Sequence, residues 1–446
     1  MRAPIPNSAS PTAWKAAAWL GVIVFIATHF GWAIAKGLSA TAAEGEMSHV
    51  ALEFARSGRL ADAFRAGQGL TAHVMPVTPI LAGLIYRAFG PMSDVSEFIL
   101  TGWSTSVALA MYLIAYRLFR AIGANTGAAR IALLFALVFP LSLLFEASVF
   151  RVWEGALGAL LSLIFLLMLV RYEANKDYTW KPTLRLGLVA AALIFVSPPL
   201  GIPAYLCALI SVVTQQRYTM WLKTGLIATA ALAIVLTPWV IRNEQAFGKF
   251  IPLRDNFGIE YAIGMNPGSV GTSDRKASHE RRIAYVHPMH SDDAYSRMSR
   301  VGEYQYAKDW AQATNKWVLE HPGDAAQLMA VNAFEYFYSP PWLWSVENGR
   351  SIVSYAGGQM ILHYTITTLA LIAAVLFLRR GRWWTYLCIM QFGPVLTYMV
   401  TQPWPRYHYI TIALEVFLAA ELIATVLRHY ADSRRGPSSV AATLSV

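Results

Sequence analysis

The sequence predicts an all-α, polytopic membrane protein with about ten transmembrane helices. Of its 446 residues, 56% are hydrophobic and only 14% are charged, and the mean hydropathy is +0.42. A water-soluble domain cannot bury that much apolar surface, so the apolar runs are expected to lie in a membrane. The 15 tryptophans and 21 tyrosines fit the aromatic belts found at membrane interfaces.

The net charge of +10 has a simpler explanation than nucleic acid. The basic residues sit mostly in short clusters between apolar runs, where cytoplasmic loops carry them. Membrane orientation therefore accounts for the charge, and no nucleic-acid partner is expected. Cys207 and Cys388 both lie inside apolar runs, so we interpret them as small core residues and not as a disulfide or a metal pair.

The first apolar run, 14–35, is long enough to cross a bilayer. A cleaved signal peptide is the alternative, but the run exceeds the roughly 7–15 apolar residues of a signal sequence. The segment 76–90 is also apolar, yet its 15 residues suit a helix lying at the interface. Further spans are expected at about 95–119, 128–146, 150–171, 219–241, 358–378, 383–401 and 407–428.

The stretch 184–214 is interrupted by SPPLGIP (197–203). Two prolines and a glycine cannot continue an apolar helix, so the stretch is either a hairpin of two short, protein-buried helices or a re-entrant segment. All basic clusters fall on one side of the membrane if 76–90 does not cross. Both termini are then cytoplasmic.

The chain divides into four predicted parts. They are an N-terminal membrane domain (1–241) with a first outer loop at 36–94, a large extracytoplasmic loop (242–356), C-terminal membrane helices (357–430) and a disordered cytoplasmic tail (431–446). Within the large loop, helices near 302–320 and 323–338 are expected to form a small cap on the membrane domain.

Acidic, basic and aromatic residues converge on the outer side of this topology. The first loop, the RVWE turn (151–154), the large loop and the PWPRYHY turn (403–409) all face it. We expect the spans to be nearly free of ionisable residues, whereas a channel or carrier more often places such residues in mid-membrane. The pattern favours chemistry at the outer interface over transport.

Several motifs, in order along most of the chain, resemble one known family. They are the first loop from EGEMSH to LIYRAFG (44–90), VFRVWEGALGALL (149–161), TPWVIRNEQAFGKFIPLRDNFGIEYAIGMNP (237–267), WVLEHPGDAAQLMAVNAFEYFYSP (317–340) and PRYHYITIALEVFLAA (405–420). This series resembles the C-type, polyprenyl-phosphate-sugar-dependent glycosyltransferases, which include protein O-mannosyltransferase-like and lipid A aminoarabinose transferase-like enzymes. The acid of the first loop is Glu46 here, where the family usually has Asp, and PRYH replaces the family's PRYR.

The resemblance implies roles for two groups of residues. Glu46 is the candidate general base that takes the proton of the acceptor hydroxyl, with Glu44 in reserve. We expect burial beside the membrane to raise the pKa of Glu46 toward the working range, although a solvated loop carboxylate is the alternative. Arg406 and Arg242 are candidates for the donor phosphate because a forked guanidinium matches phosphate oxygens. Tyr407 and His408 are expected to add hydrogen bonds, and the alternative for Arg242 is an interfacial residue beside Trp239.

Other polar residues are weaker candidates for the cavity. His73 faces the same side, and Arg151 and Glu154 either pair with each other or line the cavity, with a structural pair favoured. Asn256 and Asn266 either shape a turn or bind sugar hydroxyls. His287 and His290 have a spacing seen among metal ligands, but we interpret HPMHSDD as an exposed loop, and no metal ligand is assigned. A divalent metal cofactor is left open.

The predicted function is transfer of a sugar from a polyprenyl-phosphate donor to a hydroxyl of a lipid, glycan or protein, with inversion, on the periplasmic face of a bacterial inner membrane. The absence of a P-loop or Rossmann motif fits a lipid-linked donor better than a nucleotide sugar. A lipid-phosphate-binding carrier or flippase component and a non-catalytic member of the same fold are the alternatives. The sugar, the acceptor and the lipid length are set by pocket shape and do not follow from motifs.

Overall fold

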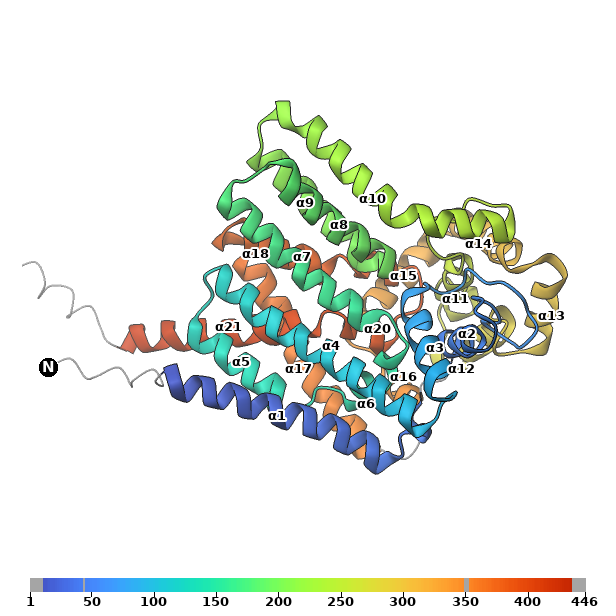
Figure 1. Cartoon of the computed structure of the whole chain (residues 1–446), viewed down its shortest axis with the longest axis horizontal. Coiled ribbons are helices and arrows are strands. Elements are labelled where there is room, and N and C mark those ends of the chain that lie inside the picture. Colours follow the sequence, from blue (N-terminus) through green and yellow to red (C-terminus); the bar gives the residue numbers. More distant parts are fainter. Residues whose placement is uncertain (1–10, 43–44, 349–352, 435–446) are drawn as a thin grey trace, which may run out of the picture.

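The computed structural model describes residues 11–42, 45–348 and 353–434. These residues are almost entirely helical, with no strand among them beyond a single antiparallel bridge between Ala61 and Leu70. The all-α prediction is confirmed. Most helices run along the long axis of the molecule, and α1 (Pro11–Lys36) begins at the end of the bundle where α21 (Ile412–Arg434) stops (Figure 1).

The helices of the bundle come from the parts of the chain before and after the large loop (242–356), which is called the long loop below. In chain order its members are α1, α4 (Asp94–Ala121), α5 (Thr126–Val138), α6 (Leu143–Ala147), η2 (Val149–Arg151), α7 (Gly155–Asn175), α8 (Trp180–Val196), α9 (Pro198–Gln215), α10 (Tyr218–Phe247), α17 (Val353–Phe377), η4 (Leu378–Arg380), α18 (Arg382–Phe392), α19 (Val395–Tyr398), α20 (Pro405–Tyr409) and α21.

The other elements gather at one end of the bundle, which we call the loop end (Figure 1). They come from the first loop and the long loop. They are η1 (Ser39–Thr41), α2 (Glu46–Ser57), α3 (Val77–Phe89), α11 (Phe257–Gly264), η3 (Pro267–Ser269), α12 (Arg275–Val286), α13 (Asp292–Val301), α14 (Glu303–Glu320), α15 (Pro322–Phe337) and α16 (Pro341–Asn348). The helices α14 and α15 lie where the sequence placed the two helices of the cap.

Six of the described helices are long and apolar enough to cross a membrane, and a seventh candidate arises if the bent pair Thr126–Val138 and Leu143–Arg151 is one span. Several of them carry apolar side chains that would be unfavourable in water, such as Leu20 (62% exposed) on α1 and Leu222 (75% exposed) on α10. The protein is therefore a multi-pass membrane protein. The predicted count of about ten spans is not confirmed, because α8 and α18 are short and α21 carries several charges.

Two predicted spans are broken at prolines, and two further stretches are each divided into two helices. The run 128–146 bends at Phe139–Pro140, and 383–401 divides at Pro394 into α18 and α19. The run 407–428 begins within the short helix α20 and continues in α21 after a break at Ile410 and Thr411. The stretch 184–214 consists of α8 and α9, separated at Ser197, as the hairpin alternative predicts. The outward face of α9 is exposed, however, so these helices are not protein-buried on both sides.

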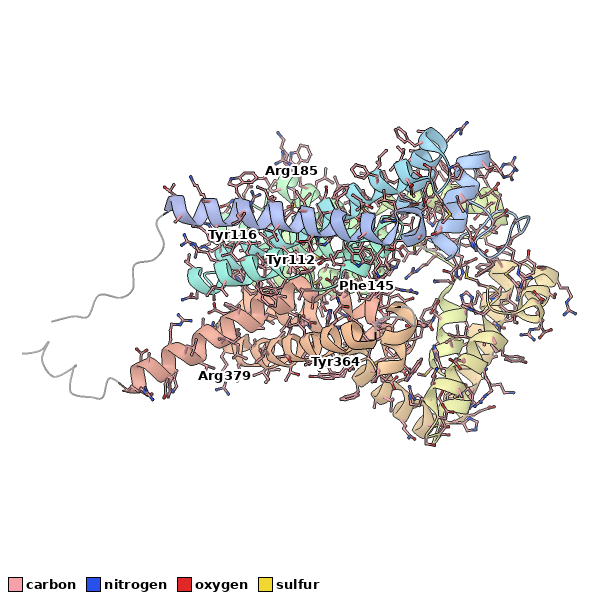
Figure 2. The ribbon with its side chains drawn as sticks, turned by 90° about the horizontal axis from the view of Figure 1, so that it is seen from below. Tyr112, Tyr116, Phe145, Arg185, Tyr364 and Arg379 are labelled. Carbon is pink, nitrogen blue, oxygen red and sulfur yellow. The ribbon has the colours of Figure 1, made fainter. Side chains whose placement is uncertain are left out.

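The basic loops meet at the end of the bundle opposite the loop end. There Glu421 accepts hydrogen bonds from Arg380 and from the backbone N–H of Asn125, both at 2.9 Å. Glu173 accepts hydrogen bonds from Arg382 and Tyr386. Figure 2 places Arg379 near this end and Tyr112 and Phe145 inside the bundle. The loops that carry Arg380, Arg382 and Asn125 therefore meet at this end of the bundle.

The expectation that the spans are nearly free of ionisable residues is wrong. The fully buried carboxylate of Glu146 accepts hydrogen bonds from Tyr112 and Tyr409, both at 2.7 Å, and lies 2.7 Å from His29 Nε2. A second buried carboxylate, Glu415, is 2.6 Å from His408 Nε2. Each of these residues is a single ionisable residue within an apolar run, so the hydropathy pattern did not reveal it. Each is hydrogen-bonded to other protein groups, as a buried charge requires.

Candidate functional site

Glu46 lies at the start of α2, where the chain leaves the first span and turns into the first loop. Its Oε1 is 3.2 Å from Nε2 of His287, which follows α12, and His73 comes from the loop between α2 and α3. One ligand atom from each of the three residues lies within 4.8 Å of the others. Both histidines are buried, at 2% and 4% exposure, whereas the Glu46 side chain is 28% exposed.

This arrangement corrects the interpretation of HPMHSDD as an exposed loop. His287 is buried because its ring packs edge-on against Phe64 at 5.5 Å and against His73 at 6.0 Å, while His290 stays exposed. The short spacing between His287 and His290 did not predict which residues contact His287. The partners of His287 come from the first loop, more than 200 positions away in the sequence.

The electrostatics of Glu46 also differ from the expectation. Burial alone would raise the pKa of Glu46, but the hydrogen bond and the charge of His287, together with His73, hold it well below its ordinary value. Burial lowers the pKa of His73 to about 3, although Glu46 opposes this. Burial would likewise lower the pKa of His287, but Glu46 raises it overall. Glu46 is thus a firmly ionised carboxylate, because its histidine partners outweigh its desolvation.

The three residues form a donor set suited to a divalent cation. One carboxylate and two imidazoles are the protein ligands of many catalytic zinc sites, in which a further position stays open. Nδ1 of His73 is buried and has no hydrogen-bond partner among the described residues, which is unusual for a buried imidazole nitrogen. The residues present therefore fit a metal ion.

A second group of charges lies beside this cluster. Arg254, just before α11, donates from Nη1 to Oε1 of Glu154 at 3.1 Å, and Glu154 precedes the first residue of α7. The other carboxylate oxygen of Glu154 is buried without a hydrogen-bond partner among the residues the structure describes. Burial raises the pKa of Glu154, and the nearby guanidinium groups of Arg254 and Arg406 counteract only part of this effect.

The PRYHY turn supplies the remaining polar side chains. The guanidinium carbon of Arg406 lies 5.2 Å from the centre of the Tyr407 ring, and Tyr407 stacks on Tyr398 at 4.7 Å. Burial raises the pKa of Tyr407 to about 12, so its hydroxyl stays protonated and can donate. The charge of Glu46 contributes to the raised pKa of Glu154, and the charge of Arg254 contributes to the lowered pKa of His73, so the two groups lie near each other.

Two of the four predicted phosphate-binding residues lie in this site and two have other partners. Arg406 and Tyr407 belong to it. Arg242 donates to the backbone carbonyls of Leu60 and Thr71, both at 2.7 Å, and so fastens the first loop to the end of α10. His408 points away into the bundle, where it pairs with Glu415.

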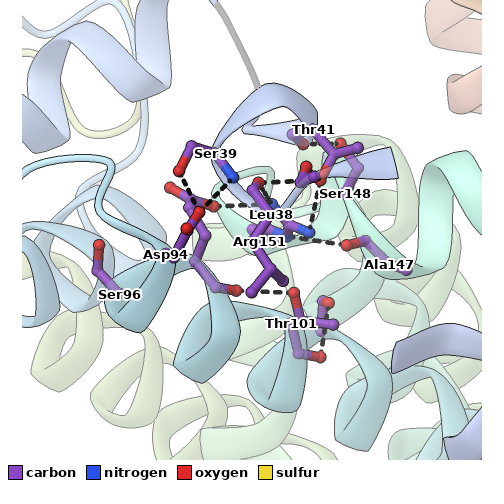
Figure 3. A network of polar contacts seen from close by, with 12 residues as sticks. Leu38, Ser39, Thr41, Asp94, Ser96, Thr101, Ala147, Ser148 and Arg151 are labelled. Carbon is purple, nitrogen blue, oxygen red and sulfur yellow. Dashed lines mark hydrogen bonds and ion pairs between the residues drawn. The ribbon is translucent and has the colours of Figure 1, made fainter. Parts of the chain in front are cut away.

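Arg151 and Glu154 do not pair with each other as the sequence suggested. The fully buried Arg151 pairs with Glu97 at 2.8 Å and donates to the carbonyls of Ala147 and Leu38 (Figure 3). This network binds the first loop to α4 and η2, whereas Glu154 faces Arg254. The turn places the two side chains on different sides, so that one holds the fold and the other lines the site.

The predicted asparagines fall outside this cluster. Asn266 caps its own turn by accepting from Gly268 N at 3.0 Å, and it ties that turn to α12 by donating to Ser278 Oγ at 3.0 Å. Asn256 stands at the start of α11, and its backbone carbonyl accepts from Ile259 and Glu260. Glu44 lies outside the described residues.

Sequence reasoning missed Arg254 and the role of His287. Arg254 lies inside the quoted IPLRDNFG motif and could have been found as the sole basic residue between Lys249 and Arg275. No signal in the sequence predicted the pairing of His287 with Glu46, since it depends on how the two loops pack.

The same fold occurs in solved glycosyltransferases. The apo oligosaccharyltransferase of Archaeoglobus fulgidus matches with a TM-score of 0.55 at 13% identity, over 96% of this chain and 52% of that one. Its complex with Zn and sulfate matches with a TM-score of 0.50 at 13% identity, over 93% and 49% of the two chains. A weaker likeness, with a TM-score of 0.40 at 13% identity over 91% and 78%, relates the chain to ArnT from Cupriavidus metallidurans bound to undecaprenyl phosphate.

No protein-family model and no curated protein matches the sequence. The chain spans about half the length of the oligosaccharyltransferase that it matches. At this level of identity the likeness shows the fold alone, which is the C-type glycosyltransferase fold that the motifs predicted.

Proposed function

We propose that the protein transfers a sugar from a polyprenyl-phosphate donor to a hydroxyl acceptor, with inversion, at the loop end of the bundle. The observation that carries the proposal is the meeting of the Glu46–His73–His287 cluster with Arg254, Glu154 and the PRYHY turn on this fold. The distribution of basic loops supports a cytoplasmic location for the opposite end. The site then faces the periplasm of a bacterial inner membrane.

The donor phosphate would be held by Arg254 and Arg406. Arg254 contacts Glu154 directly at 3.1 Å, and the charge of Arg406 likewise opposes the raised pKa of Glu154. The leaving polyprenyl phosphate keeps its negative charge, and fixed positive groups stabilise that charge as the bond breaks. The protonated hydroxyl of Tyr407 can donate one further hydrogen bond to it.

The reaction is a single displacement at the anomeric carbon. The acceptor oxygen forms a bond to that carbon while the bond from the carbon to the phosphate oxygen breaks, and the hydroxyl proton passes to a carboxylate. Glu46 is the base that the sequence indicates. The structure adds Glu154 as a second candidate, because it has a free oxygen among the described residues, a raised pKa and a neighbouring guanidinium.

Glu46, His73 and His287 are the residues that would hold a divalent metal. Such an ion would supply Lewis-acid stabilisation of the charge that develops in the site. The two histidines and Glu46 also join the first loop to the long loop, so they keep the two walls of the site together whether or not an ion is bound.

The buried ionisable residues of the bundle do not favour the carrier alternative. The carboxylates of Glu146 and Glu415 are fully buried among the described residues and hydrogen-bonded to protein side chains, as structural groups are. A transfer assay separates an enzyme from the non-catalytic alternative.

The test is sugar transfer by the purified full chain from a panel of polyprenyl-phosphate sugars, with Glu46→Gln and Glu154→Gln beside the wild type. Glu53→Gln on α2, whose carboxylate pairs with Arg56 at 2.7 Å, is the matched control. Loss of about a hundredfold or more in rate identifies the base, and the control should stay within about twofold. If both Gln variants transfer at the wild-type rate, the assigned site is wrong; if no donor is consumed, the enzyme proposal fails.

A further inference from the structure

A cavity of about 270 Å³ lies between α7, α8, α9 and α10. It occupies the half of the bundle nearer the basic end, by which we mean the end that carries Arg380 and Arg382. Residues of α7 and α8 form its inner wall, and those such as Leu169 and Ala190 are buried. On α10 the cavity reaches Gly225, which lies about 25 Å from Arg242 at a rise of about 1.5 Å per residue. The cavity is therefore separate from the site at the loop end.

The cavity opens sideways, between α9 and α10. The residues that line it there are exposed, Leu209 and Val213 on α9 by 59% and 47%, and Trp221 on α10 by 40%. On the inner side α8 and α10 pack closely, because a Cβ on Gly187 would lie 3.1 Å from a side chain of α10. A Cβ on Gly225, in contrast, would have no heavy atom within 4 Å. Because α9 and α10 are membrane-spanning candidates, this opening faces lipid.

The surface of the cavity is apolar almost throughout. Three of its polar residues are bonded to one another, directly or through Gln216. The Gln216 side chain donates to the hydroxyl of Tyr172 at 3.0 Å and accepts from that of Thr224 at 2.7 Å, and the hydroxyls of Tyr172 and Thr183 are 2.9 Å apart. The hydroxyl of Tyr205 has no hydrogen-bond partner among the described residues, but it adds little to this apolar surface. The chemistry of the walls therefore fits a hydrocarbon ligand.

The size of the cavity fits part of a lipid chain. An apolar cavity of about 150 Å³ binds a molecule of benzene. By proportion, a cavity of about 270 Å³ takes a chain segment of roughly ten carbons. Walls that face an unfilled space lose their packing contacts, and the lipid chains beside the opening can supply them.

Positive charge surrounds the entrance. The stretch 178–243 contains no acidic residue, and four of its basic residues belong to the ends of α8 and α10 near the basic end, namely Lys181, Arg185, Arg217 and Lys223. Arg217, Trp221 and Gly225 follow each other at intervals of four residues, so Arg217 stands at the start of the α10 face that lines the cavity. No side chain caps the start of α10, so its first N–H groups can also bind an anion.

We propose that the cavity binds one acyl chain of an anionic phospholipid, whose phosphate lies at Arg217 and the start of α10. The opening begins at Val213 and Trp221, about one turn from the ends of the two helices, so a lipid of the leaflet at the basic end can enter it directly. The connection between α9 and α10 lies at that end of the bundle (Figure 1). The tail of a polyprenyl donor would have to arrive from the loop end, where its phosphate is placed. The proposal does not depend on the function proposed above.

Binding is measured by native mass spectrometry of the full chain in detergent. The probes are palmitoyl-oleoyl phosphatidylglycerol, the phosphatidylcholine with the same chains, and undecaprenyl phosphate. Wild type should retain one phosphatidylglycerol per chain and bind it about fivefold or more tightly than phosphatidylcholine. Arg217→Ala should remove this preference, because the headgroups differ in net charge.

Gly225→Leu tests the cavity itself. The new side chain enters the open space beside α10 and meets no backbone there, so it should block the acyl chain and weaken phosphatidylglycerol binding about tenfold or more. Val213→Trp, which narrows the opening from α9, should have the same effect and replaces Gly225→Leu if that variant folds poorly. A lipid that binds only the folded protein also raises its Tm, so phosphatidylglycerol should stabilise wild type more than either variant.

Two control variants carry matched changes outside the cavity. Gly31→Leu on α1 places the same side chain at another exposed helical glycine, where a Cβ would also have no heavy atom within 4 Å. Arg379→Ala removes an exposed arginine near the basic end (Figure 2). Neither should change the affinity for phosphatidylglycerol or the preference over phosphatidylcholine.

The depth of the chain is measured by cross-linking. Phosphatidylglycerol with a diazirine at the end of one acyl chain should label α7 or α8, which form the inner wall. The proposal is overturned if no phosphatidylglycerol is retained, if Gly225→Leu binds it as tightly as wild type, or if labels fall only on outward residues such as Leu222. If undecaprenyl phosphate displaces phosphatidylglycerol and itself loses affinity in Gly225→Leu, the cavity belongs to a polyprenyl tail and the phospholipid assignment is wrong.

Discussion

Replacing Arg254 by Met should remove the ion pair that links Glu154 to the rest of the site. The two side chains are 25% and 5% exposed, and their charged atoms are 3.1 Å apart. At an effective dielectric constant of about 20, Coulomb's law gives an attraction of about 5 kcal/mol for this separation. Desolvation of both groups cancels much of this attraction. The coupling left between them should be about 1–3 kcal/mol.

A double-mutant cycle measures this coupling. Wild type, Arg254→Met, Glu154→Gln and the double variant are unfolded at equilibrium in mixed micelles, and the interaction free energy is taken from the four values. Lys276 and Glu280, an exposed pair on α12 with atoms 3.8 Å apart, provide the control cycle and should give less than about 1 kcal/mol. A coupling of Arg254 to Glu154 no larger than the control would refute the assignment of this pair as the charged centre of the site. Arg254→Met should also lose about a hundredfold in transfer rate if it binds the donor phosphate.

Three further predictions concern the metal cluster, a carboxyl pair and the bundle interior. His287→Ala should abolish tight zinc binding measured by calorimetry, whereas His290→Ala should retain it. Asp255 and Glu303 lie together between the first loop and α14; burial raises the pKa of Asp255 well above its ordinary value and Glu303 raises it further, so the folded protein holds a proton that the unfolded chain has lost. The stability that this proton contributes is fully present below the ordinary pKa of Asp255, and it is lost as the pH rises through the pKa of Asp255 in the folded protein. Glu303→Gln should therefore make the free energy of unfolding fall less steeply with pH. An unchanged slope would contradict the pairing. Glu415→Ala should lower the free energy of unfolding by about 3–5 kcal/mol, because buried His408 loses its partner. A loss below about 1 kcal/mol would argue against a structural role of the pair.

Sequence patterns could predict the helices but not where the bundle keeps its polar groups. Hydropathy and proline positions located most helix boundaries within a few residues, as at 184–214, since both reflect local chemistry. Glu146 and His29 escaped notice because a single polar residue barely changes the hydropathy of a long apolar run. Their burial is possible only because Tyr112 and Tyr409 reach the same carboxylate from other helices.

Motifs in the sequence supplied part of the candidate site. Glu46, Arg406 and Tyr407 were chosen from motifs, and the structure brings them to one end of the bundle. Arg254 and His287 act through partners that are distant in sequence. No spacing rule in a single sequence reports such contacts, because they are set by how the long loop folds back on the first loop.

Sugar transfer by the full chain, supplied with zinc, decides whether this protein is a glycosyltransferase. A panel of polyprenyl-phosphate sugars is offered with hydroxyl acceptors, and wild type is compared with Glu46→Gln and Glu154→Gln at equal folding. Wild type should transfer sugar, and at least one of the two variants should lose about a hundredfold or more in rate. Transfer that is unchanged in both variants, or no consumption of any donor by wild type, would contradict it.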